Sequence, residues 1–124
     1  MDKKPLAYIV EDSKDTVTIF RGALELADYE VEVAYDGATA QQRLTEIVPD
    51  LIVLDLHIPN VSGDIVLKQI RADERLKNTR VFLATADANM AEQLRDQAEI
   101  VLLKPIGFSQ LRDLADRFKP GSED

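Results

Sequence analysis

The sequence predicts an α/β fold in which helices cover both faces of a five-stranded parallel sheet. Short apolar runs alternate along the chain with longer stretches whose apolar residues recur at helical spacing. Most of the short runs are apolar at every position, as is typical of strands that are covered on both faces. Five strand–helix pairs follow one another, and this order favours an open sheet with helical crossovers.

Five segments are expected to form the strands. Four are continuous apolar runs, namely Leu6–Val10, Leu51–Leu54, Val81–Ala84 and Ile100–Leu103. The segment Glu30–Ala34 instead alternates polar and apolar residues, which is typical of an edge strand with one wet face. Right-handed crossovers and a polar second strand favour the order 2-1-3-4-5, a flavodoxin-like sandwich of three layers.

Apolar residues at helical spacing predict a helix after each strand. Caps are expected at Asp15, Ser62 and Ser109 for the first, third and fifth helices. The second helix follows Asp36-Gly37 and should stop at Pro49. The positions expected in the core are Val17, Phe20, Ala23, Leu24, Ala27, Ala40, Leu44, Ile47, Val66, Leu67, Ile70, Met90, Leu94, Leu111, Leu114, Ala115 and Phe118.

Length, charge and cysteine content narrow the possible functions. The 124 residues suit one domain, expected over residues 1–119, with 120–124 as a disordered tail. The absence of cysteine excludes thiol catalysis and Cys-based zinc sites. The net charge of −8 argues against direct nucleic-acid binding. Neither a signal peptide nor a membrane span of about 20 apolar residues is recognisable, so we expect a cytoplasmic protein without membrane contact.

Polar residues follow the carboxyl ends of four expected strands. Glu11 and Asp12 come after the first strand, Asp55 after the third, Thr85 ends the fourth and Lys104 follows the fifth. Parallel strands place these ends at one edge of the sheet, where open α/β sheets bind ligands. The topology therefore predicts that these five side chains share one site.

The three carboxylates at this edge suggest a metal ion. Two like charges about 4 Å apart repel by roughly 4 kcal/mol at an effective dielectric constant of 20. A hard divalent cation would offset this repulsion, and Mg²⁺ suits a site that supplies one or two carboxylates. With the Thr85 hydroxyl and the Lys104 ammonium, it could surround a transferring phosphoryl group, with Asp55 as nucleophile.

The ordered set of these motifs resembles the receiver domain of two-component response regulators, over about residues 5–119. The motifs are Glu11-Asp12, Asp55, Thr85-Ala86 and Lys104-Pro105, with Pro59 and Gly63 in the loop after the acceptor. The resemblance implies phosphorylation of Asp55 with the help of Thr85 and Lys104. It also implies a signalling domain that assists its own phosphorylation and dephosphorylation, rather than an enzyme.

The resemblance further implies a ligand set for the Mg²⁺ ion. Asp12 and Asp55 would bind it through their side chains, and Glu11 would act mostly through water. His57, two residues after the acceptor, would contribute its backbone carbonyl. The resemblance also implies a cis peptide bond before Pro105, which X–Pro bonds tolerate.

Partners follow from the same resemblance. A sensor histidine kinase or a phosphotransfer protein would supply the phosphoryl group, and a downstream protein of unknown identity would read it. The face made by the fourth helix, fifth strand and fifth helix is the family's usual contact surface. Its charges are mixed here, so both a monomer and a weak homodimer stay open.

One position departs from the family pattern. Receivers usually carry Tyr or Phe three residues before the lysine, and here Val101 stands there. An aliphatic side chain cannot report phosphorylation by swinging a ring, so we expect the signal to pass through movement near Asp87 to Met90. We expect His57 and Asp87 to flank the route by which water reaches the phosphoryl group, and thereby to set how long Asp55 stays phosphorylated before hydrolysis.

Three other functions are compatible with an α/β fold of this kind. A haloacid-dehalogenase type of enzyme needs a second Asp two residues after the nucleophile, where this chain has His57. A nucleotide or flavin binder lacks the Gly-rich phosphate loop it would need. A receiver-shaped module that signals by contact alone, without phosphorylation, stays open as the alternative.

Overall fold

A computed structural model describes residues 3–121 of the chain, with a five-stranded parallel sheet at its centre. The strands are β1 (Leu6–Val10), β2 (Glu30–Ala34), β3 (Leu51–Leu54), β4 (Arg80–Thr85) and β5 (Ile100–Leu103). Their order is β2-β1-β3-β4-β5, which confirms the predicted topology. Most of the predicted disordered tail, residues 122–124, lies outside the described residues.

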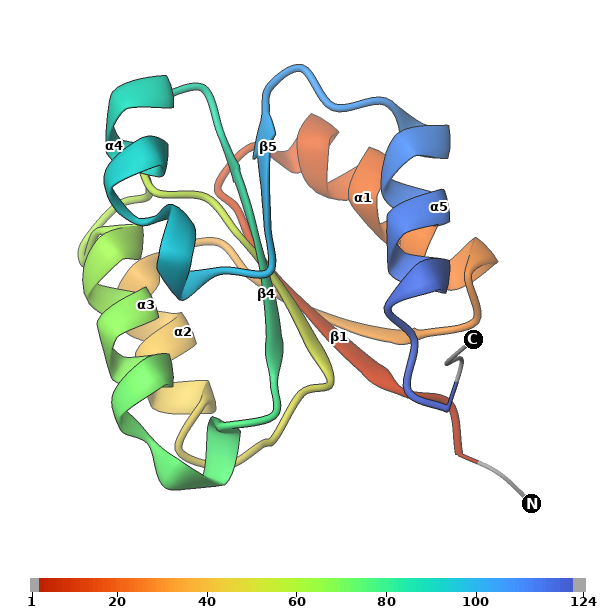
Figure 1. Ribbon diagram of the computed structural model, residues 1–124, viewed down its shortest axis with the longest axis horizontal. Coiled ribbons are helices and arrows are strands. Elements are labelled where there is room, and N and C mark those ends of the chain that lie inside the picture. Colours follow the sequence, from red (N-terminus) through yellow and green to blue (C-terminus); the bar gives the residue numbers. More distant parts are fainter. Residues whose placement is uncertain (1–2, 122–124) are drawn as a thin grey trace.

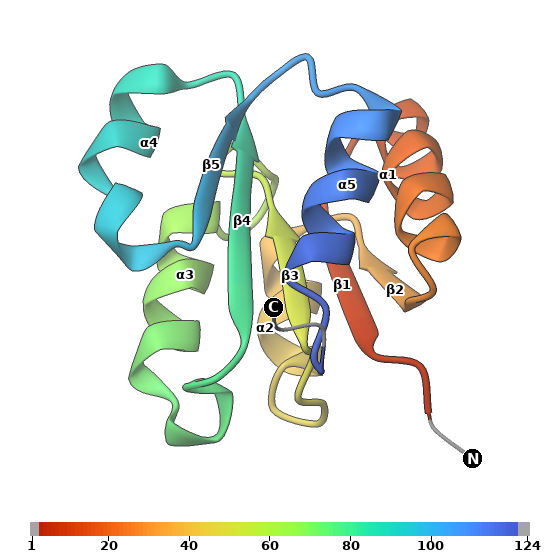
Figure 2. The ribbon, with the colours of Figure 1, turned by 45° about the vertical axis from the view of Figure 1, so that its right-hand side comes forward.

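Helices form a layer on each face of the sheet. One layer contains α1 (Lys14–Leu26) and α5 (Phe108–Arg117), and the other contains α2 (Gly37–Arg43), α3 (Gly63–Ala72) and α4 (Ala88–Gln93) (Figures 1 and 2). Two short 3₁₀ turns, η1 (Glu74–Leu76) and η2 (Arg95–Gln97), follow α3 and α4. Within residues 3–121, no helix is both long and apolar enough to cross a membrane.

The two faces of the sheet carry separate cores. In β1, Ala7 and Ile9 pack in the α1/α5 core, whereas Tyr8 and Val10 pack in the α2/α3/α4 core. All four are at most 1% exposed, which explains why the run is apolar at every position. The edge strand β2 instead keeps Glu30 exposed, as its alternating pattern predicted.

The cap predicted for the first helix was wrong by two residues. Ser13 is the N-cap of α1, and its hydroxyl accepts a hydrogen bond of 3.2 Å from the Thr16 amide. The Ser13 amide is itself held by Glu11 Oε2 at 3.1 Å, which starts the helix early. Asp15 lies in the first turn, where its charge favours the helix dipole.

The cap position predicted for the third helix is confirmed, whereas the cap predicted for the fifth helix was wrong. Ser62 is the N-cap residue of α3, but its hydroxyl oxygen accepts no hydrogen bond from a helix amide, and the hydroxyl donates to Asp64 Oδ1 instead. Ser109 lies inside α5, which begins at Phe108 after Gly107. The helix α5 therefore begins two residues earlier than a cap at Ser109 would require.

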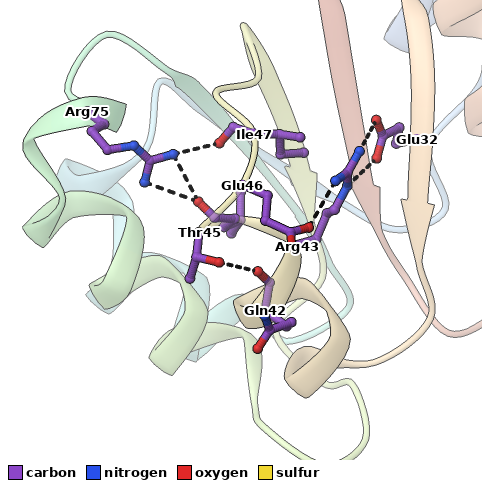
Figure 3. Close-up of polar contacts among 8 residues, drawn as sticks. Glu32, Gln42, Arg43, Thr45, Glu46, Ile47 and Arg75 are labelled. Atoms are coloured by element: carbon purple, nitrogen blue, oxygen red, sulfur yellow. Dashed lines mark hydrogen bonds and ion pairs between the residues drawn. The ribbon is translucent and has the colours of Figure 1, made fainter.

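Two arginines shape the end of α2, which stops at Arg43, four residues before the expected apolar position Ile47. Arg43 donates to both oxygens of Glu32 on β2, at 2.9 and 3.0 Å, and these bonds hold the pKa of that carboxyl below its usual range (Figure 3). Arg75 of η1 donates to the backbone carbonyls of Leu44 at 3.3 Å and Ile47 at 3.0 Å. A guanidinium therefore satisfies carbonyls that the helix leaves without partners.

Replacing Arg75 by methionine should lower the free energy of unfolding by about 1–2 kcal/mol, because the carbonyls after α2 lose charged donors at a partly exposed site. Arg112→Met is the matched control, since among residues 3–121 the Arg112 guanidinium pairs only with its exposed neighbour Asp113, and the substitution should change stability by less than about 0.5 kcal/mol. Urea unfolding of both variants measures the difference. Equal effects would contradict the role given to Arg75.

Candidate functional site

The predicted site residues meet at the carboxyl ends of the strands. Glu11 follows β1 and is 2% exposed, and Asp55 follows β3 and is 7% exposed, whereas Asp12 is exposed. Each of the three offers a carboxylate oxygen, and these oxygens all lie within 4.8 Å of one another. The Asp55 amide donates to the Val10 carbonyl at 3.0 Å, so parallel pairing of β1 and β3 sets this approach.

Lys104 lies directly between two of the carboxylates. Its ammonium group is 2.6 Å from Glu11 Oε1 and 2.9 Å from Asp55 Oδ2. Burial disfavours the charge of Lys104, but the hydrogen bonds to these carboxylates outweigh it and raise the pKa of the amine. The Lys104 ammonium therefore already offsets part of the repulsion between the carboxylates.

The remaining charge of the cluster suits a divalent cation. Three carboxylates and one ammonium leave two negative charges uncompensated. Both oxygens of Glu11 already have partners, in the Lys104 ammonium and the Ser13 amide. Burial nevertheless raises the pKa of Glu11, and those two hydrogen bonds oppose the shift. Within residues 3–121, Asp12 has no ion-pair partner, so its exposed carboxylate is available to a metal with hard oxygen ligands.

A second group of polar residues joins the loops after β3 and β4. Thr85 is fully buried, and its hydroxyl accepts a hydrogen bond of 3.1 Å from the Asp87 amide. Asp87 caps α4 by accepting from the Met90 amide at 2.9 Å. Its other oxygen lies 2.7 Å from His57 Nε2.

The contact between His57 and Asp87 shifts the pKa values of both side chains. The hydrogen bond to Asp87 raises the pKa of His57, and bonds from the Met90 amide and from His57 lower the pKa of Asp87. The sequence predicts that His57 and Asp87 flank the site, but it does not predict that their side chains are in contact. They lie 30 positions apart on different loops, so no local spacing could indicate the contact.

A glycine allows the backbone to close around the acceptor. The Gly63 amide donates to the Leu56 carbonyl at 2.9 Å. A β-carbon at Gly63 would lie 2.1 Å from the Asp55 carbonyl oxygen, far inside van der Waals contact. The loop from the acceptor to α3 therefore has no room for a side chain at this position.

On the opposite side of the site, the expected cis peptide bond between Lys104 and Pro105 is present. Val101, which replaces the usual aromatic residue, is half-buried and packs against the core of the α4 layer, together with Met90 and Leu94. The described structure thus has the threonine of the family switch and an aliphatic side chain, packed on the α2/α3/α4 core, where the ring would be.

Comparison with known proteins gives a consistent result. The family model of the response regulator receiver domain matches residues 7–116. DivK of Brucella ovis, a polar-differentiation response regulator, is 35% identical over 101 residues, which cover 79% of this chain and 82% of that protein. Hybrid signal transduction histidine kinase D of Dictyostelium discoideum is 38% identical over 92 residues. The match covers 74% of this chain but 6% of that kinase, so several relatives are much longer proteins.

Solved structures of response regulators have the same fold as this chain. The receiver domain of a LuxO repressor protein from Vibrio parahaemolyticus is 30% identical and superposes with a TM-score of 0.83, covering 93% of this chain and 89% of that one. CheY4 of Vibrio cholerae, a chemotaxis response regulator, has the same fold with a TM-score of 0.84 at 24% identity, covering 93% and 98% of the two chains. From its sequence match and its fold, this chain belongs to the response regulator receiver domain family.

Proposed function

We propose that this domain accepts a phosphoryl group on Asp55 with the help of Mg²⁺ and thereby changes its contact surface. The observation that carries the proposal is the convergence of the carboxylates of Glu11, Asp12 and Asp55, two of which pair with the Lys104 ammonium. This arrangement offers a nucleophile, a metal site and a cation in one small volume, as phosphoryl transfer needs.

In the proposed reaction, a carboxylate oxygen of Asp55 attacks the phosphorus of a phosphohistidine. The new O–P bond forms as the N–P bond breaks, and the imidazole leaves with the electron pair and is protonated. The Lys104 ammonium, 2.9 Å from Asp55 Oδ2, and the Thr85 hydroxyl are the donors that would stabilise the charge on the phosphoryl oxygens. Hydrolysis later reverses the modification, when water attacks phosphorus and the Asp55 carboxylate leaves.

The proposed metal site uses Asp12 and Asp55 as direct ligands together with the backbone carbonyl of His57. Glu11 would act through water, in keeping with its two existing hydrogen bonds. When bound, Mg²⁺ supplies charge neutralisation and orients an oxygen of the phosphoryl group. The chain's own residues hold the acceptor in place, since the His57 amide donates to Asp55 Oδ1 at 3.2 Å.

The proposed donor is a sensor histidine kinase or a phosphotransfer protein in the cytoplasm. Relatives named as histidine kinases support a kinase partner in general. A downstream protein would then bind the changed contact surface. A module that signals by contact alone would keep the fold but would not need the ammonium and carboxylates to converge.

Incubation with Mg²⁺ and acetyl phosphate should add the mass of one phosphoryl group to the protein, as measured by intact mass spectrometry. Asp55→Asn should abolish the gain, because an amide oxygen is a poor nucleophile. Asp113→Asn is the matched control on the exposed surface of α5 and should be phosphorylated normally. An unmodified wild type, or a modified Asp55→Asn variant, would overturn the proposed function.

A further inference from the structure

Asp87 is the centre of a continuous set of hydrogen bonds that joins the acceptor loop to α4. The His57 amide donates to Asp55 Oδ1 at 3.2 Å, and the His57 ring reaches Asp87 Oδ2 at 2.7 Å. Asp87 then holds α4 through the Met90 amide at 2.9 Å, and its own amide donates to the Thr85 hydroxyl at 3.1 Å. The first turn of α4 is therefore connected through Asp87 to the acceptor loop and to Thr85 at the end of β4.

The direction of the side-chain bond is settled by its chemistry. A carboxylate only accepts hydrogen bonds, so His57 Nε2 carries the hydrogen that Asp87 receives. The His57 ring is exposed, with 64% of its side chain open to solvent, so rotation about its side-chain bonds meets little packing. This donor can therefore move to another acceptor on the same edge.

We propose that phosphorylation of Asp55 makes His57 exchange its acceptor, from the Asp87 carboxylate to an oxygen of the phosphoryl group, and that this exchange releases the start of α4. The inference rests on the proposed phosphorylation of Asp55. It names the contact that carries the signal in a chain where Val101 replaces the rotating aromatic residue.

Two physical effects act in the same direction. A phosphoryl group on Asp55 carries a charge of about −1.5 to −2 and strong acceptor oxygens, close to the loop that holds His57. The negative charge of the phosphoryl group also repels the Asp87 carboxylate. Phosphorylation therefore weakens the hydrogen bond between His57 and Asp87 and at the same time attracts the His57 ring N–H. The remaining attachments of Asp87 are the cap to Met90 and the amide bond to Thr85.

The packing beyond the cap favours movement of α4 as a whole. This helix has six residues and only Ala91 is buried, so few apolar contacts hold it in one position. Met90 and Leu94 are partly buried against the same core as Val101. These partly buried aliphatic side chains allow the helix to shift once Asp87 no longer binds the His57 ring.

The test is amide hydrogen exchange of the segment Met90 to Leu94, with and without Mg²⁺ and acetyl phosphate, in wild type and two variants. His57→Ala removes the donor, and Asp87→Ser keeps an N-cap side chain that is too short to reach His57. In the wild type, phosphorylation should speed exchange in this segment by roughly three- to tenfold. Both unphosphorylated variants should already exchange at the faster rate and change less than about twofold on phosphorylation.

Controls separate the possible failures. Amides of α1 should be unaffected throughout, and Gln93→Ala, an exposed change at the end of α4, should keep the wild-type response. Mass spectrometry of each sample reports phosphorylation independently. No mass gain would overturn the proposed function, whereas a mass gain with the same α4 response in wild type, His57→Ala and Asp87→Ser would overturn the acceptor exchange alone.

Because His57 is the only histidine, its ring signals in the NMR spectrum give a direct second measurement. They should shift when Asp55 is phosphorylated, and in Asp87→Ser they should start from a different position and still shift. Ring signals that do not respond to phosphorylation would also overturn the exchange.

Discussion

Replacing Lys104 by methionine is expected to slow phosphorylation of Asp55 by roughly 100-fold, the effect of removing one preorganised donor from a site where charge develops. Methionine keeps much of the volume of the aliphatic part of the lysine side chain, but it removes the ammonium group that lies 2.9 Å from Asp55 Oδ2. The initial rate of mass gain with Mg²⁺ and acetyl phosphate measures the effect. A rate within threefold of the wild type would contradict the role of this cation.

The same variant should also be less stable at neutral pH. Without the ammonium, the buried carboxylates of Glu11 and Asp55 lose a hydrogen-bond donor, at an expected cost of about 1–3 kcal/mol. Urea unfolding measures this change, and phosphorylation is then compared under conditions where both proteins are folded. Lys68→Met, an exposed change on α3, is the control and should alter neither property.

The second large effect is expected from Gly63→Ala. The new β-carbon would lie 2.1 Å from the carbonyl oxygen of Asp55 and 2.7 Å from Leu56 Cα, and both atoms belong to the backbone. Neither can move aside without displacing the acceptor loop, so we expect a loss of more than about 3 kcal/mol in unfolding free energy. Phosphorylation should slow as well, because the Asp55 carboxylate moves with its loop.

Gly107→Ala is the matched control for this substitution. A β-carbon at Gly107 would meet no atom within 4 Å, and the residue's φ of −75° suits alanine. Replacing the N-cap glycine by alanine destabilises the start of α5, whereas the reduced conformational freedom of the unfolded chain stabilises the protein. Because the two effects oppose each other, the free energy of unfolding should change by less than about 1 kcal/mol. Similar losses in both variants would show that close packing at Gly63 is not the cause.

Most of the fold could be predicted because its signals are local. Strands that are covered on both faces need apolar residues at every position, and the edge strand needs alternation; both patterns are visible in the sequence. The helix starts were less predictable, since several residues can serve as a cap. Ser13 rather than Asp15 begins α1, because the buried Glu11 carboxylate holds the Ser13 amide.

The site could be predicted as a set of residues but not as a set of contacts. Strand order alone brings Glu11, Asp55 and Lys104 to one edge of the sheet. The bonds of Lys104 to both carboxylates depend on side-chain rotamers and burial, which a sequence does not specify. The contact of His57 with Asp87 depends on the course of two loops after neighbouring strands.

The sequence by itself determined the layered α/β fold, the strand order and the identity of the acidic, hydroxyl and amine groups at one edge. These follow from periodicity and from the rule that parallel strands end on the same side. Only the tertiary structure shows that Lys104 binds both Glu11 and Asp55, and that the backbone around Gly63 leaves no room for a side chain. It also shows that the His57–Asp87 contact connects α4 to the acceptor loop. Such contacts join residues far apart in the chain, and their distances exist only once the backbone has packed.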